Sequence, residues 1–78
     1  MKIRTQQDVE ALQAALDQCS RTVWLIGPGG EQYDLKSDRE LHQGIDRLSG
    51  DGGENMELFA TNYADEMVMM EFYSRHVA

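Results

Sequence analysis

A chain of 78 residues with 14 acidic and 7 basic side chains, and hence a formal net charge of −7, has the size and composition of one small globular domain. We therefore expect residues 1–78 to form a single domain. The negative charge argues against nucleic acid, whose phosphates need basic partners, and against anionic membrane surfaces. Because Cys19 is the only cysteine, an internal disulfide is impossible and a metal site built on thiolates is excluded.

The sequence indicates neither a membrane segment nor a catalytic constellation. The first residues run directly into a polar helix start, unlike a secretory signal, and the apolar runs are too short to cross a bilayer. Serine, histidine, cysteine and carboxylate side chains do not recur with the spacing of a catalytic or metal site. We expect a cytoplasmic protein that is not an enzyme, holds no cofactor or metal, and does not insert into a membrane.

Residue spacing predicts a short strand and then an amphipathic helix in the first quarter of the chain. Residues 2–4 favour a strand with Ile3 pointing inward. Thr5, with Asp8 three residues later, has the pattern of a capping box, in which two side chains satisfy free N–H groups at a helix start. From residue 6 to 20, apolar residues recur every three or four positions, as on one buried helix face. These residues are Val9, Leu12, Leu16 and Cys19.

A hairpin and a second helix follow. Residues 22–26 are β-branched or aromatic, and residues 32–36 place Tyr33 and Leu35 on one face, so we expect two strands joined by the glycine-rich turn 27–30. Ser37, followed by Glu40, repeats the capping-box spacing and predicts the start of a helix. The apolar stripe of that helix comprises Leu41, Gly44, Ile45 and Leu48, and Gly50 suits a left-handed C-cap.

The last third predicts one more strand and one more helix. Residues 55–60 alternate, with Met56, Leu58 and Ala60 on one face. Asn62 and Asp65 then give a third N-cap pattern ahead of residues 63–76. The apolar composition of residues 67–73 also fits a buried strand, but the cap and the acidic first turn favour a helix.

The order of elements is strand, helix, strand, strand, helix, strand, helix. Its fold class is α+β, an open-faced β-sandwich of the split βαβ type. We expect a four-stranded antiparallel sheet covered by three helices on one face.

Several short motifs at shared spacing resemble the histidine-containing phosphocarrier proteins (HPr) of the bacterial sugar phosphotransferase system. Leu35-Lys36-Ser37 is similar to that family's step from strand to second helix. The stretch 48–58 resembles its leucine–glycine helix end leading to a last strand, and 60–66 resembles its entry to the third helix. The resemblance spans almost the whole chain and implies the βαββαβα sandwich of that family.

The resemblance also implies where phosphate chemistry would lie. In that family a histidine at the start of helix 1 carries the phosphoryl group and an arginine two residues later assists. Here these positions are occupied by Gln6 and Asp8, and the two histidines, His42 and His76, lie elsewhere. A carboxylate would repel a phosphate, so we expect a divergent member that carries no phosphate on histidine and acts as an interaction or regulatory module.

Two alternatives remain open at this point. Ser37 is the candidate for retained phosphotransfer or regulatory phosphorylation, since a phosphate at a helix N-terminus is favourable. The other alternative is an unrelated split βαβ module that binds proteins.

The last helix supplies the candidate partner surface. Its apolar residues surround more of a helix than one buried stripe requires, and methionine-rich surfaces adapt well to partners. The candidate contacts are Met67, Val68, Met70 and Phe72. We expect the partner to be another protein or a second copy of the chain, as a homodimer.

Overall fold

The computed structural model describes residues 3, 5–50 and 52–76, and its fold is α+β. The elements are α1 (Gln6–Gln18), β1 (Val23–Ile26), β2 (Gln32–Asp34), α2 (Asp38–Ser49), a short 3-10 helix η1 (Gly53–Asn55), β3 (Glu57–Ala60) and α3 (Tyr63–His76). From the first helix onward, this order is the predicted one. The last segment is a helix, so the strand alternative for residues 67–73 is wrong.

The sheet is antiparallel and open, with strand order β2-β1-β3. Trp24 in the central strand lies opposite Asp34 on one side and Phe59 on the other. The predicted first strand, residues 2–4, lies outside the described residues except for Ile3, which is not in a strand. Over the described residues the sheet therefore has three strands and not the predicted four.

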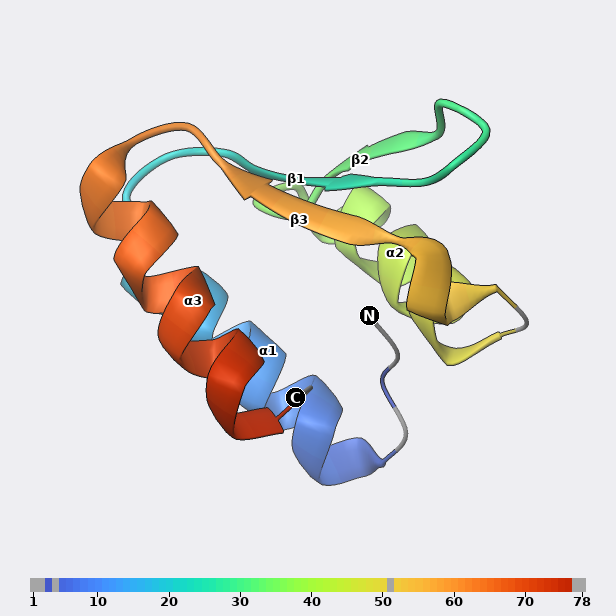
Figure 1. The fold of residues 1–78 in the computed structure, drawn as a ribbon, viewed down its shortest axis with the longest axis horizontal. Coiled ribbons are helices and arrows are strands. Elements are labelled where there is room, and N and C mark those ends of the chain that lie inside the picture. Colours follow the sequence, from blue (N-terminus) through green and yellow to red (C-terminus); the bar gives the residue numbers. More distant parts are fainter. Residues whose placement is uncertain (1–2, 4, 51, 77–78) are drawn as a thin grey trace.

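Figure 1 shows the three α-helices on one side of the sheet, with α1 and α3 side by side and running in opposite directions. β1 alternates accordingly: Val23 and Leu25 are fully buried against the helices, while Trp24 and Ile26 on the bare face are only half-buried. The buried hydrophobic core consists of Ile3, Leu12, Ala15, Leu16, Cys19, Val23, Leu25, Leu35, Leu48, Met56, Met69 and Phe72.

The helix α2 packs closely against the sheet because Gly44 has no side chain. A Cβ at Gly44 would lie 3.0 Å from Leu35 Cδ2 and 3.2 Å from Leu25 Cδ2, inside normal packing distance. Gly44 therefore allows α2 to approach the sheet closely. The other members of the predicted apolar stripe, Leu41, Ile45 and Leu48, pack on the core.

Two predicted boundaries differ for local reasons. β2 ends at Asp34 and not at residue 36, because the Asp34 carboxylate accepts the Lys36 backbone N–H (2.9 Å) and its carbonyl accepts that of Ser37 (3.0 Å), which turns the chain. Gly50 is not left-handed: its φ is −94°, and the left-handed residue of this loop is Gly52 at φ +83°. The carbonyl of Arg47 accepts the Gly50 N–H at the helix end.

Candidate functional site

The start of α1, where the resemblance would place a phosphorylated histidine, forms a closed capping box. The Asp8 backbone N–H donates to Thr5 Oγ1 (3.1 Å), and the Thr5 backbone N–H donates to Asp8 Oδ2 (3.2 Å), so the predicted box is confirmed. Gln6 is exposed beside it. A helix N-terminus attracts anions, and here the chain's own carboxylate already lies there.

The start of α2 differs from the prediction. Ser37 is the N-cap residue, but its hydroxyl makes no capping hydrogen bond, so the reciprocal box with Glu40 is wrong. The Glu40 carboxylate instead accepts the Asp34 backbone N–H (3.1 Å), which turns it toward β2. Asp38 and Glu40 make this first turn acidic. A phosphate on Ser37 would meet the favourable helix end and two carboxylates at once.

Neither histidine lies in the first turn of α1 or α2, although His76 borders the same hollow as Ala11 of α1. His42 is exposed on α2, and His76 is exposed in the last turn of α3, where its ring stacks on Phe72 with centroids 5.4 Å apart. Within residues 3, 5–50 and 52–76 no three histidine, cysteine or carboxylate side chains gather as a metal site.

Asp65 is a buried polar side chain with several hydrogen-bond partners. Its carboxylate is buried and accepts the backbone N–H groups of Ser20 and Arg21 (each 3.0 Å) and the Asn62 side-chain amide (2.7 Å). Asn62 in turn accepts the Asp65 backbone N–H (2.9 Å), which confirms the predicted third cap. The Ser20 N–H, followed by the other donors, holds the pKa of Asp65 below its ordinary value despite burial.

Lys36 performs a related task at the same, C-terminal end of α1. Its ammonium donates to the carbonyls of Leu16 (2.7 Å) and Cys19 (3.0 Å), although α1 has no basic residue in its own last turn. A cation there satisfies free carbonyls and complements the helix dipole. Burial raises the pKa of the neighbouring Cys19 thiol, helped by the negative charge of Asp65. Asp65 and Lys36 thus hold the framework together.

Only the local part of the Asp65 hydrogen-bond network could be predicted from the sequence. The cap spacing of Asn62 and Asp65 predicted their local contact, but no periodicity shows that residues 45 positions apart meet, as Ser20 and Asp65 do. For Lys36 the only signal was its place in a motif resembling a known family.

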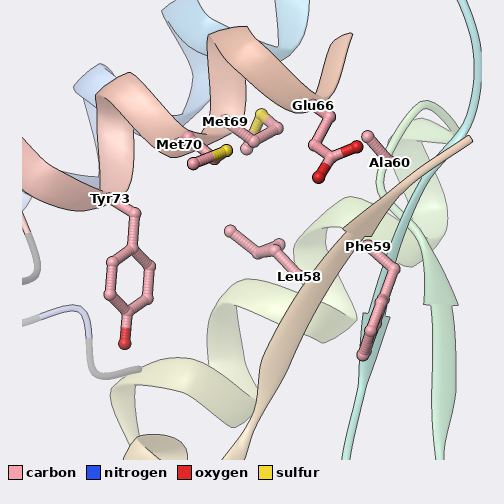
Figure 2. Close-up of a pocket in the computed structure, with 7 residues that line it drawn as sticks. All are labelled: Leu58, Phe59, Ala60, Glu66, Met69, Met70 and Tyr73. Carbon is pink, nitrogen blue, oxygen red and sulfur yellow. The ribbon is translucent and has the colours of Figure 1, made fainter. Parts of the chain in front are cut away.

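A hollow of about 370 Å³ separates β3 from α3. Figure 2 shows Leu58 pointing from the strand toward the helix, while Phe59 points to the other face of the sheet. The opposite wall comes from the helix, with Glu66 as its carboxylate. The lining residues are Leu58, Phe59, Ala60, Glu66, Met69, Met70 and Tyr73. The hollow is therefore mainly apolar, with an acidic group in its wall.

The outer edge of β3 borders this hollow. The backbone polar groups of Val23 and Gly27 form hydrogen bonds on the β2 side of β1. Because these groups alternate in direction along a strand, those of Trp24 and Ile26 point to the other side, toward β3. Alternation along an antiparallel ladder then leaves the backbone groups of Leu58 and Ala60 on the outer side. Over the described residues, no strand pairs with this edge.

The predicted contact residues on α3 divide into two sets. Met67 and Met70 are 48% and 57% exposed, whereas Phe72 belongs to the buried core and Val68 packs against it. Phe72 is therefore not available at the surface, whereas Val68 is still partly exposed. Two further residues belong to this surface beyond the predicted ones: Tyr63, which is 77% exposed, and Tyr73, which lines the hollow.

Within the described part of the chain, the polar groups considered above have different surroundings: Thr5 caps α1, Asp65 and Lys36 join distant segments, His76 stacks on Phe72, and Ser37 makes no capping hydrogen bond. The structure also contains, among these residues, no helix long and apolar enough to cross a membrane. In comparisons with known proteins, no family model, no curated protein and no solved structure matches this chain.

Proposed function

We propose that the chain is a non-enzymatic interaction module of the HPr-like type that carries no phosphoryl group on histidine. The observation that supports this most directly is the start of α1. There Gln6 offers no imidazole, and Asp8 brings a carboxylate to the helix end that a phosphate would need. In this proposal the protein has a regulatory role linked to sugar uptake or metabolism.

The proposal retains the four-stranded sandwich, with residues 2–4 as the remaining strand. The open outer edge of β3 supports it, because a further strand can pair there. The buried side chain of Ile3 supports it as well, since an inward-pointing residue is what the alternation of such a strand requires.

The partner in this proposal is another protein, whose apolar side chains, flanked by basic residues, contact the α3 side of the hollow and leave the outer edge of β3 to residues 2–4. The apolar lining supports the first part, and Glu66 in the wall, on a chain of net charge −7, supports the second. Met69 and Met70 suit such a site because methionine side chains repack readily around different shapes.

The first experiment tests phosphate transfer. The protein is incubated with phosphoenolpyruvate and the general enzyme of the phosphotransferase system, and its intact mass is measured against a histidine-containing phosphocarrier as the positive control. We expect an unchanged mass. Added phosphate on a histidine would overturn the proposal.

The second experiment tests binding, with the unphosphorylated general enzyme as the probe. Tyr73→Glu places a charge in the lining of the hollow, whereas Gln43→Glu adds the same charge on the exposed surface of α2. We expect the first variant to bind at least about 10-fold more weakly and the second to bind like the wild type. If the wild type does not bind, the link to sugar transport is overturned and the unrelated split βαβ module is the better account.

Ser37 supports the second candidate function, regulatory phosphorylation. Its hydroxyl makes no capping hydrogen bond and is therefore not committed to the helix end. A serine kinase of the same system, added in parallel, tests this: phosphate mapped to Ser37 would establish the alternative.

A further inference from the structure

The bare face of the sheet, which the helices do not cover, combines aromatic and acidic side chains (Figure 1). Side chains directly opposite each other on an antiparallel ladder point to the same face. The register therefore places Trp24 between Asp34 of β2 and Phe59 of β3, in one row across the bare face. Glu57 lies in the next row, diagonal to Trp24, because it is opposite Ile26.

The side chains of this group are accessible in the isolated chain. Phe59 is 47% exposed, Glu57 is exposed, and Trp24 and Asp34 are half-buried. In an antiparallel sheet, directly opposite residues have Cβ atoms about 4.5–5.5 Å apart, and diagonal neighbours are about 7–8 Å apart. A cation placed on the Trp24 ring would therefore be within reach of the carboxylates on both sides of it.

The negative charge of the bare face has no counter-charge in the part of the chain that the structure describes. There, Arg47 and Arg75 pair with carboxylates elsewhere, Lys36 caps α1, and no ion pair includes Asp34 or Glu57. The Asp34 carboxylate gives one oxygen, Oδ1, to a backbone N–H of the turn. A second copy of the chain would bring like charges together on this face. The occupant that complements it is therefore positively charged.

We propose that the bare face binds an arginine side chain from a basic segment of another protein, with the guanidinium on Trp24 and beside Asp34 and Glu57. Aromatic rings attract cations placed over their faces, and tryptophan does so most strongly. Arginine fits better than lysine, because its planar guanidinium stacks on a ring and can donate two parallel hydrogen bonds to one carboxylate. This goes beyond the proposed function, because it uses the side of the sheet away from the helices and requires no enzyme of sugar transport.

Nuclear magnetic resonance of the isotope-labelled protein tests the proposal, because Trp24 is the only tryptophan and its indole N–H gives a single signal. The probe is a short capped peptide of alternating arginine and glycine. A matched peptide has neutral citrulline in place of every arginine. At about 0.15 M salt we expect a Kd of roughly 1 mM for the arginine peptide and binding at least about 10-fold weaker for the citrulline peptide. The largest shifts should be those of Trp24 and Phe59.

Variants of the carboxylates test their part without removing the ring. Glu57→Gln should weaken binding of the arginine peptide about 3-fold or more, and so should Asp34→Asn, which keeps an Oδ1 acceptor for the turn. Glu10→Gln removes the same charge from the exposed surface of α1 and should bind like the wild type. Unchanged dispersion of the amide signals checks that each variant is folded.

Several results would overturn the proposal. They are the absence of a saturable Trp24 shift up to about 10 mM peptide, equal binding of the citrulline peptide, shifts that gather on the helices, and wild-type affinity in both Glu57→Gln and Asp34→Asn. An indole signal that moves when the protein alone is diluted would show that a second copy covers the bare face, and this too would overturn it.

Discussion

The starts of α1 and α3 have the same sequence pattern, a polar N-cap residue with an aspartate three positions later, but they lie in different surroundings. In α1 the pair Thr5 and Asp8 is at the surface and closes a local box. In α3 the aspartate of the pair, Asp65, is buried and also accepts two backbone N–H groups of the segment that follows α1. The pattern thus specifies a helix start, while burial decides whether the same carboxylate also joins distant segments.

The largest expected loss of stability comes from changing the buried aspartate, Asp65, and it distinguishes a carboxylate that joins distant segments from one that only caps a helix. Asp65→Asn keeps the volume but replaces one carboxylate oxygen with an amide donor, which then faces N–H groups that need an acceptor. We expect the thermal midpoint to fall by roughly 10 °C or more. Thermal unfolding followed by circular dichroism measures it. Asp17→Asn, an equal charge change on the exposed surface of α1, is the control. Equal midpoints for the two variants would mean that burial does not distinguish the two helix starts.

The stability of the protein at acid pH should also depend on the Asp65 carboxylate. Because the folded-state pKa of Asp65 is lowered, its contribution to stability is present above the ordinary value of about 3.9 and is lost as the pH falls through the folded value. Urea midpoints of the wild type should therefore decrease from pH 5 to pH 3 more steeply than those of Asp65→Asn. A smaller slope should remain, since the pKa of Glu31 is also lowered, by its own backbone N–H and by Arg47 at 2.7 Å. Parallel slopes would exclude Asp65 as the acid-sensitive group.

The two ends of α1 give a further test. The free carbonyls at the C-terminal end are satisfied by a distant residue, Lys36, whereas the N-terminal end is capped by residues of its own first turn. Lys36→Met removes both hydrogen bonds to the carbonyls and should lower the free energy of unfolding by about 1–2 kcal/mol. Arg39→Met, which removes an exposed positive charge on α2, is the matched control and should change it little. Chemical denaturation of both variants decides whether geometry or net charge is responsible.

The same contrast explains what the sequence could predict. Hydrophobic spacing located α1, α2 and the three strands of the described residues, because each buries one face against a common core, while α3 was located by its cap and its acidic first turn. It could not show that Asp65 reaches residues 20 and 21, that Lys36 caps α1, or that Phe72 turns inward while Met70 turns outward. The first two depend on tertiary packing. The third depends on the phase of a helix whose apolar residues occupy more than one face, so periodicity alone does not fix it.

The smallest expected effect concerns the two serine or threonine caps. Thr5 accepts the Asp8 N–H, so Thr5→Ala should lower the free energy of unfolding by about 1 kcal/mol. Ser37 has the same position in α2 but makes no such bond, and Ser37→Ala should therefore change it by less than about 0.5 kcal/mol. Urea denaturation of both alanine variants measures the difference. If Ser37→Ala proves as destabilising as Thr5→Ala, the hydroxyl caps α2 in solution and is not free for modification. A near-neutral Ser37→Ala would mean that this helix start is held by Glu40 and the turn at Asp34, which leaves the hydroxyl available to a kinase.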